Sequence, residues 1–204
     1  MPDQFVEHTE QEQLKKPQKN WQKELWEWFK IIVIALLLGL FLRYFVVQRN
    51  VVQGNSMYPN LQDRDRVFVE LVTKHFAGFN HGDIVTIKTE QVPGYESYKA
   101  EGEEAPRLIK RVIGCPGDHI RIKDGFIYVN DIKLSESYIA SDLVTEPFDS
   151  RYVDVTLAED EYYVLGDNRN HSRDSRSFGP VHKSDIVGKL WFRVYPYENF
   201  GKVE

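Results

Sequence analysis

Residues 107–114 read Arg-Leu-Ile-Lys-Arg-Val-Ile-Gly, a mostly apolar stretch with a lysine near its middle. If this stretch is a β-strand, Leu108, Lys110 and Val112 share one face, because successive side chains of a strand point to opposite sides. Lys110 then projects between apolar neighbours, and removal from water lowers the pKa of a lysine. A neutral lysine amine can act as a general base for a serine hydroxyl.

A serine that suits this base lies upstream, in Gly54-Asn55-Ser56-Met57-Tyr58-Pro59. Gly54 lets the backbone come close to a ligand, and Pro59 fixes the next bend. No His or Asp lies near Ser56 in the sequence to activate it, and Ser–Lys pairs are a known variant of the Ser-His-Asp arrangement. We therefore predict a catalytic Ser56/Lys110 dyad. The structural alternative is that Ser56 bonds to local backbone and that Lys110 is solvated.

A third polar stretch, residues 166–176, follows the apolar residues 161–165. Asp167, Asp174 and Arg176 can form charge-assisted pairs that hold a loop in one geometry. Ser172 could orient a lysine amine, as the third group of a triad does. The carboxylates and His171 are also possible metal ligands, but the EF-hand spacing and a histidine pair are absent and the arginines would repel a cation. We therefore expect neither a metal ion nor a cofactor.

Composition limits the remaining possibilities. The 204 residues fit one globular domain with an appendage, and a hydrophobic fraction of 42% can supply a core. A net charge of −5 gives no reason to expect a nucleic acid partner. Cys115 is the single cysteine, so no intramolecular disulfide can form. Because Cys115 has no obvious histidine partner, we interpret it as a small apolar turn residue rather than a nucleophile.

The N-terminal part combines a polar tail with an apolar segment. Residues 1–22 are mostly polar, and residues 31–42 form an uncharged run of twelve. Extended to residues 28–47, the run approaches the length that crosses a bilayer, so we predict a transmembrane helix over 23–47. A cleaved signal peptide is disfavoured because no small-residue cleavage site follows the run. A buried helix of a soluble protein is also disfavoured, because the run has no polar face. A slight excess of lysines before the span favours a cytoplasmic N-terminus, with residues 48–204 outside the cytoplasm.

The rest of the chain alternates between apolar and polar residues, as β-strands do. We interpret residues 89–106 as an exposed loop and residues 115–160 as a hairpin and cap region, with Asp124-Gly125 as the hairpin turn. No helical pattern lies between the strands, so we predict a mainly β, antiparallel domain behind one transmembrane helix. The predicted strands cover residues 66–72, 83–88, 107–114, 119–123, 126–129, 161–165 and 185–194.

Together these features resemble bacterial type I signal peptidases, of the single-span form seen in Gram-positive bacteria. The resemblance extends over most of the chain beyond the tail. It is carried by the apolar anchor followed, in order, by Gly-Asn-Ser-Met-Tyr-Pro-Asn-Leu at 54–61, His-Gly-Asp-Ile-Val at 81–85, Arg-Leu-Ile-Lys-Arg-Val-Ile-Gly-Cys-Pro-Gly-Asp at 107–118, and the polar stretch 166–176.

The resemblance implies a largely β catalytic domain that cleaves signal peptides from exported preproteins after small residues at positions −1 and −3. It implies Ser56 as nucleophile, Lys110 as general base and Ser172 as a hydrogen-bond partner of the Lys110 amine. Asp167, Asp174 and Arg176 would support the site.

The resemblance also suggests how substrate and oxyanion would be held. Val52 and Ile109 would help line the substrate pockets. Gram-negative members carry a hydroxyl residue where Gly54 stands, so here the oxyanion would depend on backbone N–H groups, that of Ser56 first. Asn60 and His81 replace residues that are often Thr and Arg in the family. The implied partners are signal peptides and the lipid bilayer.

Two other classes of protein fit parts of the sequence. A Ser/Lys autoprotease of the repressor type shares the β fold, but such proteins are soluble and the apolar segment speaks against this. A membrane-tethered β binding module without catalysis would give no reason for Ser56, Lys110 and residues 166–176 to occur together.

Overall fold

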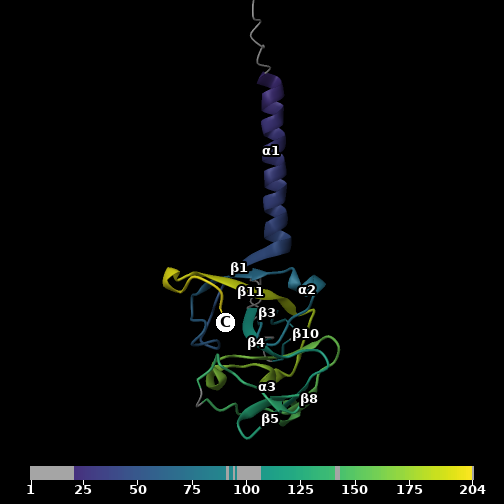
Figure 1. Cartoon of the computed structure of the whole chain (residues 1–204), viewed down its shortest axis with the longest axis vertical. Helices are drawn as coiled ribbons and strands as arrows, with labels where there is room; N and C mark the ends of the chain where they lie inside the picture. Colours follow the sequence, from purple (N-terminus) through teal and green to yellow (C-terminus); the bar gives the residue numbers. More distant parts are fainter. Residues whose placement is uncertain (1–20, 91, 94, 96–106, 141–142, 204) are drawn as a thin grey trace, which may run out of the picture. The chain divides into compact units, whose positions relative to one another are not determined.

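The computed structural model describes residues 21–90, 92–93, 95, 107–140 and 143–203. Most of the predicted tail (1–22) and most of the predicted loop (89–106) lie outside these residues. The chain divides into two units between Leu40 and Phe41, drawn in Figure 1. Within the predicted loop, Thr89 and Val92 are buried, so its beginning is not exposed as predicted.

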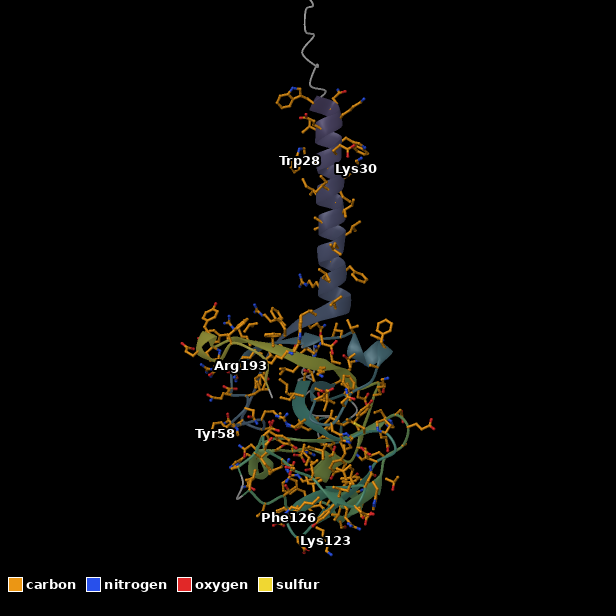
Figure 2. The ribbon with its side chains drawn as sticks, viewed as in Figure 1. Trp28, Lys30, Tyr58, Lys123, Phe126 and Arg193 are labelled. Carbon is orange, nitrogen blue, oxygen red and sulfur yellow. The ribbon has the colours of Figure 1, made fainter. Side chains whose placement is uncertain are left out.

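Helix α1 (Trp21–Phe41) supplies the described part of the first unit with its residues 21–40, and none of its residues is buried. Trp28 and Lys30 project from different sides of the helix (Figure 2). The prediction of a helix over 23–47 differs from the structure at its end, because a π-helical turn occupies Leu42–Val46 and β1 begins at Val47. Among the residues that the structure describes, no helix combines the length and the apolarity needed to cross a membrane.

The second unit is built on a seven-stranded antiparallel sheet (Figure 1). Its strands alternate buried and exposed residues where one face is covered, and β4 is buried along most of its length because both faces are covered. In spatial order the strands are β1 (Val47–Val51), β2 (Arg66–Glu70), β11 (Ile186–Tyr195), β3 (Ile84–Lys88), β4 (Arg107–Gly114), β9 (Glu161–Leu165) and β10 (Val181–His182).

A smaller four-stranded antiparallel sheet lies at the opposite end of this unit from β1 and β11 (Figure 1). The predicted hairpin is present, with Asp124 and Gly125 both at positive φ, as a tight type I′ turn requires. The order is β7 (Ile132–Lys133), β6 (Phe126–Val129), β5 (His119–Lys123) and β8 (Asp154–Thr156). The predicted mainly antiparallel β fold is thus confirmed.

Short helices complete the second unit. Among the described residues these are α2 (Thr73–Phe76), α3 (Ser175–Phe178) and the 3₁₀ turns Ser150–Tyr152, Arg169–His171 and Tyr197–Asn199. One apolar cluster joins Met57 to Ile109 on β4, and another joins Ile113 and Leu165 to Ile120 of the small sheet. The core therefore fixes the Ser56 turn, β4 and β9 in one body.

Candidate active site

Ser56 lies in a tight turn after β1 whose apolar neighbours are buried. The Tyr58 N–H donates to the Asn55 carbonyl (3.1 Å), and the Leu61 N–H donates to that of Met57 (2.9 Å). Met57 and Leu61 are almost fully buried, whereas Tyr58 is exposed at the surface (Figure 2). Burial of residues on either side of Tyr58 thus holds the turn while Ser56 remains partly accessible.

Lys110 reaches Ser56 from the middle of β4. Its Nζ donates to Ser56 Oγ over 2.7 Å, and only 2% of the residue is exposed. The pKa of Lys110 is lowered to about 8, mainly by burial; the carboxylates of Asp174 and Asp167 oppose this shift, and the Arg176 guanidinium adds to it. At pH 7 about one tenth of this amine is therefore uncharged.

The loop after β9 holds the backbone of the Ser56 turn. The Asn168 N–H donates to the Ser56 carbonyl (3.0 Å), and Asn168 Nδ2 donates to the Asn55 carbonyl (3.1 Å). A Cβ atom on Gly166 would lie 2.5 Å from the Ser56 carbonyl oxygen and 2.2 Å from Ser172 Oγ. Only glycine at position 166 allows this close approach of the two chain segments.

Ser172 does not make the hydrogen bond that was expected of it. The residue is buried beside Gly166, but within the described part of the chain its Oγ has no hydrogen-bond partner. The expected hydrogen bond to the Lys110 amine is therefore absent from this structure. A buried hydroxyl without a partner is unfavourable, so Ser172 retains an unused hydrogen-bonding group next to the dyad turn.

Asp174 and Arg176 form a buried pair that shapes the loop. Arg176 Nε and Nη2 donate to the two Asp174 oxygens, each over 2.8 Å, and Asp174 also accepts from the Gly166 N–H (3.1 Å). Asp174 caps the N-terminus of α3 through the Arg176 N–H. The Arg176 guanidinium donates further to the Arg169 carbonyl (2.7 Å). A bidentate pair of this kind fixes a loop geometrically.

Asp167 makes a second buried pair, with Arg111 of β4. Arg111 Nε and Nη2 donate to its two oxygens, each over 2.8 Å, and Asn60 Nδ2 donates to the same carboxylate (2.8 Å). The Arg111 guanidinium also lies over the Tyr138 ring, 4.1 Å from its centroid. Asp167 thus connects the loop to β4 and to the segment after Ser56.

The other predicted site residues have the following surroundings. Val52 and Ile109 are buried in one apolar cluster together with Met57. The Gly54 N–H donates to Asp63 Oδ1 (2.8 Å). Because that N–H is already engaged, Gly54 does not present it to an oxyanion in this structure.

Reasoning from the sequence missed several residues that hold the site together. Asn60 donates to the Tyr138 carbonyl as well as to Asp167. Arg169 pairs with Glu136 and donates to Thr145 Oγ1 (2.6 Å), so the segment around 136–145 is tied to the loop. One feature of the sequence could have pointed to these contacts. Arg111 follows Lys110 directly in an apolar strand, so its charged side chain lies on the opposite face and needs a buried partner there.

Cys115 has a histidine neighbour that its place in the sequence does not indicate. His81 and Asp118 bring their ligand atoms within 4.8 Å of the Cys115 sulfur. Burial raises the pKa of Cys115 to about 11, with Asp118 and Asp83 adding to the rise. The free thiol therefore remains protonated near neutral pH and is a poor nucleophile.

Comparison with known proteins identifies relatives over nearly the whole chain. Residues 25–195 match the family described as "Signal peptidase, peptidase S26". The chain is 35% identical to signal peptidase I S of Bacillus subtilis (strain 168), covering 89% of this chain and 95% of that protein. It is 33% identical to a signal peptidase I of Bacillus licheniformis, covering 91% and 96%. A solved structure of a signal peptidase I from Enterococcus faecalis V583 is 29% identical in sequence. The match covers 55% of this chain and 96% of the solved chain, with a TM-score of 0.40.

Proposed function

The chain belongs to the signal peptidase family, peptidase S26, and we propose that it removes signal peptides from exported preproteins with Ser56 as nucleophile and Lys110 as general base. The observation that supports these roles is the 2.7 Å contact between a buried amine and a serine hydroxyl on a turn. That distance lies within the reach required of a nucleophile and its base. The lowered pKa of Lys110 supports the role of base near neutral pH.

The proposed reaction is acyl transfer in two steps. Neutral Lys110 takes the proton from Ser56 Oγ as this oxygen attacks the scissile carbonyl carbon, and an oxyanion forms. The protonated Lys110 then gives its proton to the departing amine of the mature protein, which leaves the signal peptide as an ester on Ser56. Lys110 next takes a proton from water as the water oxygen attacks the ester carbonyl, and then gives this proton to the departing Ser56 Oγ. The bond between Ser56 and the acyl group breaks, and the signal peptide leaves with a free carboxylate.

The oxyanion is proposed to accept from the Ser56 backbone N–H. Gly54 is not the second donor in this arrangement, because its N–H is bonded to Asp63. A missing oxyanion donor costs about 3 kcal/mol in the transition state.

We propose that Val52 and Ile109 border the pockets for small residues at −1 and −3. The support is that both residues share an apolar cluster with Met57, which lies beside the dyad.

Cleavage of a preprotein with an Ala-X-Ala site tests this proposal. Full-length chain in detergent is expected to cut after the second Ala, whereas Ser56→Ala and Lys110→Ala lose roughly 10³-fold or more in kcat/KM. Ser135→Ala and Lys123→Ala are matched controls, because both residues are exposed, and they are expected to cleave normally. Normal cleavage by either dyad variant would refute the assigned roles.

We also propose that α1 attaches the enzyme to a membrane as a single-pass anchor, with the N-terminus cytoplasmic and residues 48–204 outside. The support is the uncharged apolar run 31–42, whose side chains are almost all exposed on the helix. Trp26 and Trp28 precede the run, as interfacial aromatics do. Protease treatment of intact cells is expected to degrade the β domain but to spare an N-terminal tag; the reverse pattern would contradict this orientation.

A further inference from the structure

A second group of chemically reactive side chains lies apart from Ser56, on two turns that face one another. His81 belongs to the turn 80–83, in which the Asp83 N–H donates to the Asn80 carbonyl (3.1 Å). Cys115 and Asp118 begin and end another turn, in which the Asp118 N–H donates to the Cys115 carbonyl (3.0 Å). Reciprocal backbone hydrogen bonds of 2.8 Å from Gly82 to Val112 and from Val112 to Asp83 hold the first turn against β4.

The ligand atoms of these three residues converge. His81 Nε2 lies 2.7 Å from Asp118 Oδ2, and the Cys115 sulfur lies within 4.8 Å of both side chains' ligand atoms. Bonds of about 2.0–2.3 Å to Zn²⁺ place tetrahedral ligands roughly 3.5 Å apart. Small side-chain rotations would therefore bring one nitrogen, one sulfur and one oxygen to a common ion.

The surroundings of Asp118 resemble the support that metal ligands usually have. Asn130 Nδ2 donates to Asp118 Oδ1 (2.7 Å), and the Cys115 N–H donates to Asp118 Oδ2 (2.8 Å). Such outer contacts orient a carboxylate ligand. Asp118 is largely buried while His81 is half exposed, so an ion could enter from the His81 side and keep a water molecule as its fourth ligand.

We propose that His81, Cys115 and Asp118 form a binding site for Zn²⁺ or a closely similar transition-metal ion. Nitrogen, thiolate and carboxylate together are a ligand set suited to Zn²⁺, and thiolate disfavours Mg²⁺ and Ca²⁺. On binding, the Cys115 S–H proton is released to solvent and a metal–sulfur bond forms. This departs from the expectation, drawn from the sequence, that the chain holds no metal.

Two other His–Asp pairs show why the cysteine matters to this proposal. His119 Nε2 lies 2.6 Å from Asp154 Oδ1, and His182 Nδ1 lies 3.1 Å from Asp160 Oδ2. Among the described residues, only the His81 pair also has a cysteine sulfur within reach. The His182 pair therefore provides a matched control, with the same two side-chain types and no thiolate.

The test is Zn²⁺ titration of tag-free, full-length chain in detergent, after chelator treatment, by calorimetry and by metal analysis following dialysis. Wild type is expected to bind one Zn²⁺ per chain, and binding raises the Tm because Zn²⁺ favours the folded state. Cys115→Ser and His81→Gln are expected to weaken binding at least about tenfold and to lose the Tm increase. His182→Gln is expected to bind as wild type does.

Spectroscopy with Co²⁺ adds a readout that identifies the sulfur directly. Wild type loaded with Co²⁺ is expected to show a thiolate-to-metal charge-transfer band, which is absent from Cys115→Ser although this variant has an unchanged circular dichroism spectrum. The proposal is overturned if wild type retains no Zn²⁺ through dialysis, or if both substitutions leave affinity and Tm increase unchanged.

Discussion

Lys110 is a buried amine in contact with the hydroxyl that it is proposed to deprotonate, so its protonation state should govern the reaction. Only the neutral amine can accept the Ser56 proton, and its pKa is lowered to about 8. Below this pH the neutral fraction falls about tenfold per pH unit. We expect kcat/KM to rise from pH 6 to pH 8 by roughly fiftyfold and to level off above about pH 9.

A pH–rate profile on a fixed preprotein measures this rise, with circular dichroism at each pH to verify that the chain stays folded. Lys123→Ala removes an exposed lysine amine, so this variant serves as the control and is expected to keep the profile. A profile that is flat between pH 6 and pH 8 would exclude Lys110 as the base.

Gly166 is a second residue whose chemistry determines the site. A methyl group there would meet the Ser56 carbonyl oxygen at 2.5 Å, so Gly166→Ala must displace the Ser56 turn from Lys110. Misplacement by about 1 Å can cost roughly a hundredfold in rate, and we expect a kcat loss of this order. Gly39→Ala in α1 is the matched control, because a Cβ there has no neighbour within 4 Å. Equal activity of the two variants would contradict the described packing.

At the scale of elements, the buried ion pair between Arg111 and Asp167 holds the loop 166–176 to β4. Asp167→Asn removes the negative partner of the buried Arg111 guanidinium, and breaking a buried pair in this way costs about 3–5 kcal/mol. We expect a correspondingly lower free energy of unfolding in urea. Asp149→Asn breaks the exposed pair with Arg151 and should change stability little. The account of the loop fails if both variants are equally stable.

The elements that the sequence predicted well are those with a regular pattern. The strand 107–114 and the hairpin around Asp124-Gly125 have the predicted bounds, because alternation and turn chemistry are local properties. The strand at 47–51 received no predicted bounds, since the apolar run was extended through residue 47 as a helix. The two-residue strands β7 and β10 are too short to show any alternation.

The parts of the candidate site that could be predicted from the sequence are the residues whose type and local sequence are unusual by themselves. Ser56 and Lys110 could be paired because a serine in a glycine-containing turn and a lysine in an apolar strand are both unusual. Contacts such as that of Asn168 with the Ser56 carbonyl, or of Asn60 with Asp167, depend on the tertiary approach of distant segments. No local pattern reports such an approach, which also explains why the His81–Cys115 proximity was missed.

At the scale of the whole molecule, the division between Leu40 and Phe41 has a testable consequence. All strands among the described residues, and the three apolar clusters that these residues form, lie after this division. A chain that begins at Phe41 should therefore fold with the β-rich circular dichroism of the full chain and cleave a soluble preprotein, while losing flotation with liposomes. An unfolded product would show that α1 is needed for the β domain to fold.

The central claim is that Ser56 becomes acylated by the signal peptide, and mapping of the trapped ester tests it most directly. Full-length chain is mixed with an activated ester of a peptide ending in Ala-X-Ala, quenched in acid, digested and analysed by mass spectrometry. We predict one added peptide acyl group on the fragment that contains Ser56, and no adduct in Ser56→Ala. Turnover of the ester by wild type with the acyl group on another residue, or equal turnover by Ser56→Ala, would contradict the account.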